Sequence, residues 1–225
     1  MDLKRLYALS NHPSYYKQDE VCPGLAVPLP RSAAAVEQVV GYAPGGYQIM
    51  RVVPPAHAKS VPRERLYVCG EKFGAKFWCS TSPESHVGPF RHAIDFLVPE
   101  GTEVLAACDG VVTAIKEDSK LWGPSPEFRN EVNYLDIKCE LEDSLHEPGQ
   151  QYYAEYCHLA RGSVGKYGLK VGAEVEQGQT IARTGRSGWM DVDHLHFVVW
   201  KPVDDSLFGF RSVQAGLPFP RGWMR

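Results

Sequence analysis

Several features that mark common protein classes are missing from this chain of 225 residues. It has no basic run, because 24 Lys and Arg stand against 27 Asp and Glu for a net charge of -3, and a nucleic-acid partner is not indicated. No stretch approaches the roughly 18 apolar residues that a transmembrane helix needs, and residues 1–10 lack the apolar region of a signal peptide. These observations predict a soluble chain without a transmembrane segment or a visible export signal.

Familiar metal and nucleotide motifs are also missing. None of the six cysteines has C-x-x-C spacing, which argues against a zinc knuckle or a thioredoxin-like site. His146 does not begin an H-E-x-x-H motif, and the Gly-rich segment 184–188 lacks the Lys-Ser/Thr of a phosphate-binding loop. Cys69 and Cys79 can pair as a disulfide if the chain is exported, but we expect reduced thiols in preference to this pair.

What the chain does have, from Leu66 onward, is a series of short apolar runs separated by turns, the rhythm of an antiparallel all-β domain. The Asp109-Gly110 pair within it predicts a tight hairpin. Residues 1–65 are rich in proline and predict an irregular N-terminal extension with a short helix at 33–40 and a strand at 47–53. We therefore expect three segments: an extension (1–65), a domain (66–202) and a C-terminal tail packed on that domain (203–225).

The stretch 193–200 contains an H-x-H pattern in an apolar strand. Side chains alternate across a strand, so His194 and His196 share one face while Leu195 and Phe197 take the other. A buried imidazole needs a partner for its ring nitrogens, and one metal ion can bind a nitrogen of each of two imidazoles. The pattern favours a metal site over two histidines on a solvated face.

Two further residues are candidates for such a site. A catalytic zinc centre needs three protein ligands and one open position. Asp95 lies inside an otherwise apolar run, where an unpaired carboxylate would be costly, so that a cation beside it is favoured over a buried salt bridge. His158 ends another apolar run and is a candidate, although such a residue alone is more often a core histidine.

Several short motifs follow one another in a recognisable order along residues 83–200. They are Pro99-Glu100-Gly101-Thr102-Glu103-Val104, Asp109-Gly110-Val111-Val112, Tyr156-Cys157-His158-Leu159, Val171-Gly172, Gly178-Gln179 and His194-Leu195-His196-Phe197. In this order they resemble the LytM/lysostaphin-type zinc metallopeptidases, which hydrolyse peptide bonds of peptidoglycan. The resemblance implies an antiparallel sheet, or sandwich, that lines a narrow groove, one Zn²⁺ per chain and peptidoglycan peptides as partners. It also implies a place in the cell envelope or outside the cell; because no signal peptide is visible, the cytoplasm is the alternative.

Carried over residue by residue, the resemblance implies that Asp95 and His196 bind zinc and that His158 and His194 act in catalysis. The family's first ligand lies four residues before the aspartate, where this chain has Arg91. His86 and His92 are the candidates for that role. We expect His86, because Gly88-Pro89 can fold its loop back, whereas His92 faces the opposite side of the strand unless a bulge intervenes.

Two neighbours of these residues also depart from the family pattern. Alternation predicts that Cys157 faces away from the site. Asp193 is expected to be either a turn residue or a carboxylate that orients an imidazole.

The sequence thus predicts a zinc endopeptidase acting on stem or cross-bridge peptides. The alternative is a non-catalytic LytM-like module that binds cell wall or activates another hydrolase. The presence of Asp95, His158, His194 and His196 favours the enzyme. The bond cleaved and the oligomeric state are not predicted.

Overall fold

The structure is a computed structural model of the chain. It describes residues 21–22, 25–34, 37–45, 48–52, 55–69, 77–80, 86, 88–141, 149–204 and 209–215. The strands are β1 (Val21–Cys22), β2 (Glu37–Tyr42), β3 (Gln48–Val52), β4 (Leu66–Cys69), β5 (Phe77–Ser80), β6 (Ile94–Phe96), β7 (Glu103–Leu105), β8 (Gly110–Lys116), β9 (Trp122–Gly123), β10 (Tyr134–Cys139), β11 (Tyr153–Cys157), β12 (Glu174–Val175), β13 (Thr180–Arg183), β14 (Gly188–Trp189), β15 (Leu195–Pro202) and β16 (Phe210–Ala215). The helices are short: η2 (Arg31–Ala33), η3 (Ala56–Ala58), η4 (Arg63–Arg65), η6 (Gly88–Phe90), η7 (Pro126–Glu131) and α2 (Ser163–Lys166). The predicted all-β class is confirmed.

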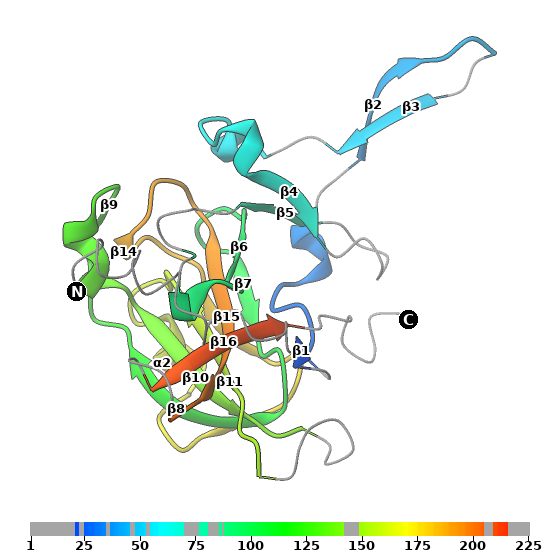
Figure 1. Cartoon of the computed structure of the whole chain (residues 1–225). Helices are drawn as coiled ribbons and strands as arrows, with labels where there is room; N and C mark the ends of the chain where they lie inside the picture. Colours follow the sequence, from blue (N-terminus) through cyan, green and yellow to red (C-terminus); the bar gives the residue numbers. More distant parts are fainter. Residues whose placement is uncertain are drawn as a thin grey trace.

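A large antiparallel sheet organises the molecule, with strand order β12-β8-β10-β11-β15-β6-β5-β4 (Figure 1). The long strand β15 lies in its middle. One edge of β15 pairs with β11, and the other pairs first with β6 and then with β16. The H-x-H strand therefore touches three neighbouring strands, each of which can bring a side chain to it.

The two faces of this sheet have different roles. In β10 the burial alternates, with Leu135, Ile137 and Cys139 in the core and the intervening residues on the other face. Strands β11 and β15 continue the pattern, because Tyr156 and Phe197 pack in the same core. The non-core face is consequently free to carry polar side chains from adjacent strands, and His196 lies on it.

The described part of the N-terminal segment contributes to this core. Strand β1 pairs with β16, and Leu25, Val27 and Leu29 are fully buried in the main hydrophobic cluster. The helix predicted at 33–40 is wrong, because β2 begins at Glu37 and pairs with β3, where a strand was expected. The Val39-Val40 pair has a higher preference for strand than for helix. The division of the chain at residues 65 and 202 stays a prediction.

The hairpin predicted at Asp109-Gly110 is also wrong. Strand β7 pairs with β13, while β8 pairs with β10 and β12. Gly110 is not among the glycines with positive φ. A Cβ at Gly110 would lie 2.2 Å from the carbonyl oxygen of Lys138, so the glycine allows two strands to approach closely instead of allowing a turn.

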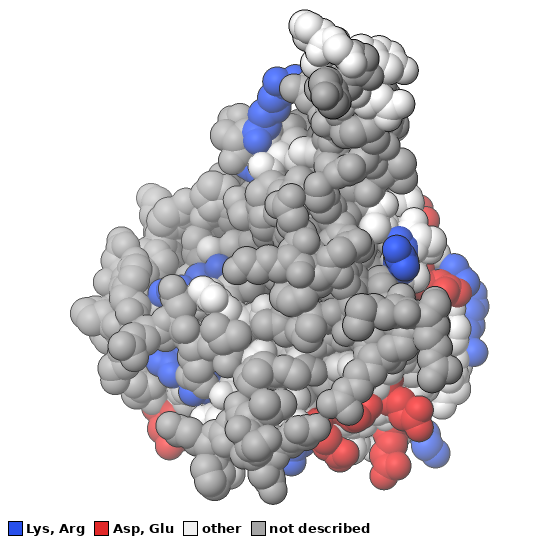
Figure 2. Space-filling model, turned by 90° about the vertical axis from the view of Figure 1, so that its right-hand side faces the viewer, with Lys and Arg blue, Asp and Glu red and all other residues white. Residues whose placement is uncertain are grey.

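Three further sequence expectations concern cysteines, membranes and charge. Cys79 is disulfide-bonded, so the expectation of a reduced thiol there is wrong, whereas Cys22, Cys108, Cys139 and Cys157 are in no disulfide; the side chain of Cys69 lies outside the described part. No helix among the described residues is long and apolar enough to cross a membrane. On the face shown in Figure 2, the acidic side chains of the described residues gather mainly at the lower edge, and the basic side chains are scattered over the face.

Candidate functional site

Asp95 is the centre of a cluster of histidines. It lies in β6 directly opposite His196 in β15, and its side chain is buried. Its Oδ1 atom is 2.8 Å from His196 Nδ1, 3.1 Å from His86 Nε2 and 3.6 Å from His194 Nε2. Sheet register therefore places the carboxylate and the second histidine of H-x-H side by side.

Asp95 and His196 each shift the pKa of the other towards the charged form. Burial alone would raise the pKa of Asp95, but the surrounding His86, His194 and His196 hold that pKa well below its ordinary value. Burial alone would lower the pKa of His196, but its hydrogen bond and attraction to Asp95 outweigh burial and raise it. Asp95 is thus an ionised carboxylate in a buried position, which attracts a cation.

His86 reaches Asp95 from the loop before η6. The backbone of Gly88 has φ +57°, a conformation that favours glycine and turns the chain back towards β6. His92 lies elsewhere, and its backbone amide donates a hydrogen bond of 3.3 Å to the Ser212 hydroxyl of β16. The structure thus brings His86 into contact with Asp95 and leaves His92 outside both clusters of potential metal donors found among the described residues.

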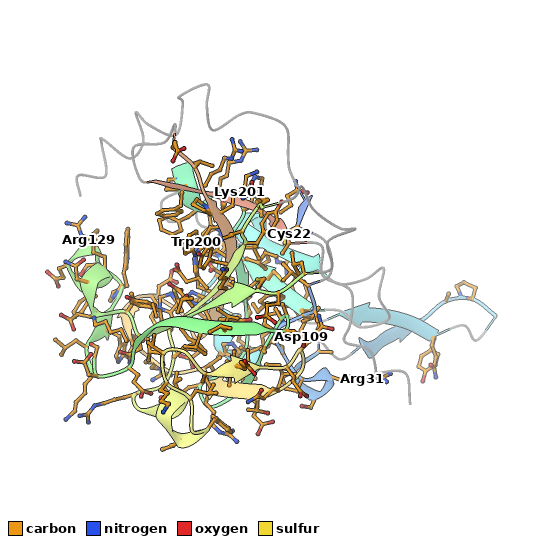
Figure 3. The ribbon with its side chains drawn as sticks, turned by 90° about the horizontal axis from the view of Figure 1, so that it is seen from below. Cys22, Arg31, Asp109, Arg129, Trp200 and Lys201 are labelled. Atoms are coloured by element: carbon orange, nitrogen blue, oxygen red, sulfur yellow. The ribbon has the colours of Figure 1, made fainter. Side chains whose placement is uncertain are left out.

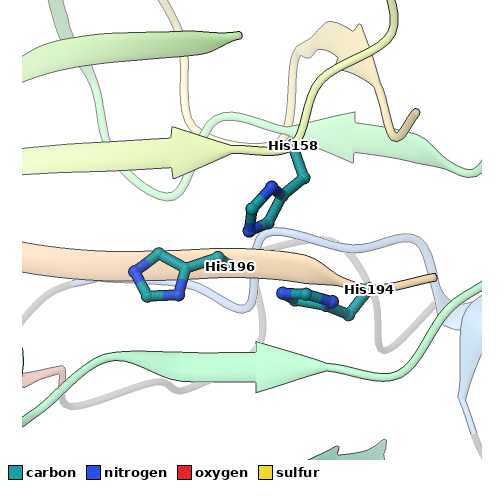
Figure 4. A group of neighbouring side chains, drawn as sticks. All are labelled: His158, His194 and His196. Carbon is teal, nitrogen blue, oxygen red and sulfur yellow. The ribbon is translucent and has the colours of Figure 1, made fainter. Parts of the chain in front are cut away.

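His158 and His194 form the other half of the site (Figure 4). Their ring centroids are 4.5 Å apart. His158 Nδ1 lies 2.7 Å from the carbonyl oxygen of Ser187, and His194 Nδ1 lies 2.8 Å from that of Val192. Because a carbonyl only accepts, each Nδ1 carries the proton and donates it, which leaves each Nε2 with a lone pair when the ring is neutral.

The protonation of His158 follows from its surroundings. Burial, together with the neighbouring His194 and His196, lowers the pKa of His158 well below its ordinary value. His158 is therefore a neutral imidazole near pH 7, which is the form that can accept a proton.

His158 also has an unusual backbone. Its φ of 61° lies in the left-handed region, which non-glycine residues seldom adopt outside turns and functional sites. The strand alternation consequently breaks at the end of β11. The prediction that Cys157 faces away from the site is wrong for this reason: Cys157 and His158 both line the same cavity, and Cys157 Sγ donates to Glu155 Oε1 at 3.2 Å.

Asn133 is a supporting residue that the sequence did not reveal. It is fully buried, and its side chain accepts from the Ser119 amide and donates to the carbonyl oxygens of Ser119 and Leu159. Its own amide donates to the Ser187 hydroxyl at 3.0 Å. Asn133 thereby connects the residue after His158 with the residue whose carbonyl holds the His158 ring. Its partners are far away in sequence, so no local pattern points to it.

Asp193 has neither of its two predicted roles. Its carboxylate accepts two hydrogen bonds from Arg186, at 2.7 and 3.0 Å. Arg186 in turn lies over the ring of Trp122, at 5.2 Å from its centroid. Asp193 therefore stabilises the loop 186–193 against the segment that carries β9.

Asp95, His158, His194 and His196 open onto one cavity of about 310 Å³, at the lower end of the range for small-ligand pockets. Its floor is formed by sheet residues and its walls by loops. The described residues that line it are Arg65, Phe90, Asp95, Pro124, Arg129, Val132, Glu155, Cys157, His158, Trp189, Met190, Asp191, His194 and His196. The segments 117–132 and 186–193 pair through β9 and β14 and supply part of the wall.

The donor atoms are suited to a metal ion. Two groups have ligand atoms within 4.8 Å of one another: His86, Asp95 and His196, and His158, His194 and His196. Donors that share a tetrahedral zinc ion at about 2.1 Å lie roughly 3.4 Å apart. The distances of 3.1 and 2.8 Å from Asp95 Oδ1 to His86 and His196 are close to that spacing. The first group also contains the ionised carboxylate, so it is the better match to a divalent cation.

A buried carboxylate with four histidines around it on an antiparallel sheet is a group of side chains that could hold a metal ion. The family model Peptidase family M23 matches residues 89–207, more than half of the chain, and the chain belongs to this peptidase family. The resemblance predicted from the motifs is thereby confirmed. His86 lies just before the matched segment.

Solved structures with a similar fold include several M23 peptidases. The catalytic domain of a mutant of the prophage-encoded M23 protein EnpA from Enterococcus faecalis is 22% identical, with a TM-score of 0.36 over 55% of this chain and 74% of that one. The catalytic domain of the antimicrobial peptidase lysostaphin from Staphylococcus simulans is 23% identical, with a TM-score of 0.35 over 54% and 74%. A zinc-containing peptidase from Vibrio cholerae is 23% identical, with a TM-score of 0.39 over 79% of this chain and 44% of that one.

Proposed function

We propose that the chain is a zinc-dependent endopeptidase that hydrolyses peptide bonds in peptidoglycan stem or cross-bridge peptides. The observation that carries this proposal is that two overlapping groups of potential metal donors meet at His196, beside one cavity, in a member of a peptidase family. One group contains the carboxylate of Asp95, and the other contains His158 and His194, whose Nδ1 atoms are held by backbone carbonyls. A non-catalytic cell-wall-binding module would need neither group.

In this proposal His86, Asp95 and His196 hold one zinc ion per chain. Two imidazoles and one carboxylate are a donor set that would suit one catalytic zinc ion. Zinc bound in this way lowers the pKa of a water molecule to about 7 and polarises a carbonyl. Asp95 is already ionised in the structure, so binding does not require the removal of its proton.

His194 and His158 act on the attacking water. The Nδ1 atom of each donates to a backbone carbonyl, so each Nε2 is left as an acceptor. We assign removal of one proton from the water, and delivery of that proton to the leaving amine, to His194, whose Nε2 lies 3.6 Å from Asp95 Oδ1. His158, whose pKa is lowered, stays neutral and would orient the same water by accepting a hydrogen bond at Nε2.

The substrate proposed here places the protein in the cell envelope or outside the cell, with action inside the cell as the alternative. Purification of the protein from the envelope, the medium and the cytosol distinguishes these two locations. Recovery of the zinc-loaded protein from the envelope or the medium supports the first, whereas recovery only from the cytosol supports the second.

The function is tested by metal content and hydrolysis measured on the same variants. We expect the full chain to retain about one zinc ion and to release peptides from purified peptidoglycan. Asp95→Ala and His196→Ala should lose both zinc and activity. His158→Ala and His194→Ala should keep zinc and lose about 10²- to 10⁴-fold in kcat, the usual contribution of general acid or base catalysis.

His86→Ala and His92→Ala form a matched pair for the first ligand. We expect His86→Ala to lose zinc and His92→Ala to keep it, because only His86 contacts Asp95. Full zinc occupancy in both variants would refute the ligand assignment. Unchanged hydrolysis in His196→Ala would refute the mechanism as a whole.

A further inference from the structure

The residues that lead into His194 lie outside the regular secondary structure. Strand β14 ends at Trp189 and β15 begins at Leu195, so the residues between them belong to neither strand. The carbonyl oxygen of Val192, within this stretch, accepts the hydrogen bond from His194 Nδ1 at 2.8 Å. The position of that carbonyl decides which ring nitrogen of His194 carries the proton. Contacts other than strand pairing therefore have to hold Val192 in place.

The side chain of Val192 packs in a second, smaller hydrophobic cluster. Its buried members are Ala58, Val61, Leu97 and Val192, and Leu66 and Trp78 pack against them. Ala58 ends η3, and Val61 follows it in the chain, so two of the four buried members come from the N-terminal segment. The segment that ends at Val61 thus packs directly behind the catalytic loop.

This small cluster connects the two sides of the site. Leu97 stands two residues after Asp95, and Val192 stands two residues before His194. A side chain removed from a closely packed cluster leaves a cavity, and its neighbours relax partly into it. A smaller residue at position 61 would consequently allow Val192 to shift, and the carbonyl that holds His194 would shift with it.

His57 adds a polar contact to the same loop. It lies in η3, and its ring makes a hydrogen bond to the backbone of Asp193. Burial lowers the pKa of His57, although the charge of Asp193 and this hydrogen bond oppose the change. The ring is therefore neutral near pH 7. The two residues before His194 are thus each held by the segment that contains η3.

These contacts come from outside the segment that identifies the family. The family model matches residues 89–207, whereas η3 and Val61 precede it. Two turns fix the path of this segment: the Ala58 amide donates to the Pro55 carbonyl at 2.9 Å, and the Val61 amide donates to the Ala58 carbonyl at 3.1 Å. The family relationship assigns no role to these residues, but their packing does.

We propose that residues 57–61 are a positioning element for His194. Val61 and Ala58 hold the side chain of Val192, and His57 holds the backbone of Asp193. The Val192 carbonyl is thereby fixed, which keeps the proton on Nδ1 of His194 and leaves Nε2 as the acceptor at the cavity. This inference rests on the function proposed above and adds residues that do not themselves line the cavity.

The main variant is Val61→Ala, and Val175→Ala is its matched control. Both substitutions remove the methyl groups of a buried valine, which is 7% exposed at position 61 and 4% at position 175. Val175 lies in β12, at one end of the large sheet, and pairs with Gly110. Figure 3 shows Asp109, the neighbour of Gly110, away from Trp200 of β15. Similar falls in melting temperature are expected, so any further difference reports on positioning.

The first measurement is the tautomer of His194 in the full chain with zinc in excess. Ring-nitrogen signals of isotope-labelled histidine are recorded in alkaline solution, where neutral imidazole dominates, and are assigned with His194→Ala. The wild type and Val175→Ala should show the proton on Nδ1 alone. Val61→Ala should show a mixture of both tautomers, because the Val192 carbonyl is no longer fixed.

The second measurement separates kcat from KM on peptidoglycan peptides. Val61→Ala should lower kcat by about 10- to 100-fold and change KM by less than about twofold, because a misplaced proton carrier slows the reaction without weakening binding. Val175→Ala should keep kcat within about twofold of the wild type. His57→Ala removes only the bond to Asp193 and should shift both measurements in the same direction by a smaller amount.

A Val61→Ala protein with the proton on Nδ1 alone, or with a kcat no lower than that of Val175→Ala, would overturn the positioning role. If Val61→Ala does not fold, the same two results in His57→Ala decide, because that side chain is only partly buried. A wild-type protein that hydrolyses no peptidoglycan would overturn the proposed function. The comparison of tautomers would then still decide whether residues 57–61 hold His194.

Discussion

A buried pair of carboxyl groups beside the cavity makes the stability of this protein depend on pH. Asp136 in β10 faces Glu155 in β11 across the sheet. The Oδ1 atom of Asp136 is buried and has no hydrogen-bond partner among the described residues. Burial and the repulsion from Glu155 raise the pKa of Asp136 from 3.8 to about 8. We therefore expect Asp136→Asn to stabilise the protein in alkaline solution.

The direction of this pH dependence follows from the pKa values of Asp136 in the folded and the unfolded state. Its folded-state pKa is above the unfolded value, so the folded state binds more protons than the unfolded state from about pH 4 to about pH 8. The contribution of Asp136 to the free energy of unfolding is therefore highest below pH 4. It falls as the pH rises from about 4 to about 8. At about 1.4 kcal/mol per pKa unit, the loss is at most about 6 kcal/mol. Solvent reaches part of the side chain and screens the repulsion, so we expect about 2 kcal/mol.

Urea unfolding from pH 5 to pH 9, with a chelator present throughout, measures this effect. At pH 5 Asp136→Asn should be only slightly more stable than the wild type, because asparagine resembles the protonated carboxyl and only the first part of the loss has occurred. At pH 9 it should be about 2 kcal/mol more stable. Glu155→Gln removes the other half of the repulsion and should act in the same direction, whereas Asp118→Asn, at an exposed position, should have no effect. Parallel curves for the wild type and Asp136→Asn would refute the reasoning.

Two more predictions concern stability and the placement of His158. Gly110→Ala should lower the free energy of unfolding by about 3 kcal/mol or more, because the new Cβ meets the Lys138 carbonyl at 2.2 Å; Gly101→Ala, with φ +86° and open space, should cost only about 1 kcal/mol in the same urea titration. Asn133→Ala should lower kcat more than it raises KM in a peptide-hydrolysis assay and should destabilise the fold by about 2–4 kcal/mol, because buried groups around Ser119 and Leu159 lose their partners. An Asn133→Ala variant with full kcat would show that the ring of His158 is held without it.

Local geometry explains which parts of the site could be predicted from the sequence. The H-x-H pattern and the isolated Asp95 are visible because alternation along a strand is a local property, and the order of the motifs identified the family. The all-β class and the family are confirmed, whereas the roles of the individual residues stay predictions.

Longer-range features could not be derived in this way. His86 was one of two candidates, since the path of a loop is not encoded in a periodic pattern. Cys157 was misplaced because nothing in the sequence shows that His158 has positive φ. The role of Gly110 could not be derived, because the sequence does not distinguish a glycine that permits close packing from a glycine that permits a turn.

The central position of β15 has a consequence for how the site responds to opening of the fold. Its backbone amides are paired with β11 on one edge and with β6 and β16 on the other, so they can exchange with solvent only when the middle of the sheet separates. His194 stands directly before this strand and His196 lies within it. Hydrogen exchange should therefore be slowest beneath the histidines and faster in the short helices η4 and η7. The histidines are thus attached to the part of the sheet that we expect to open last.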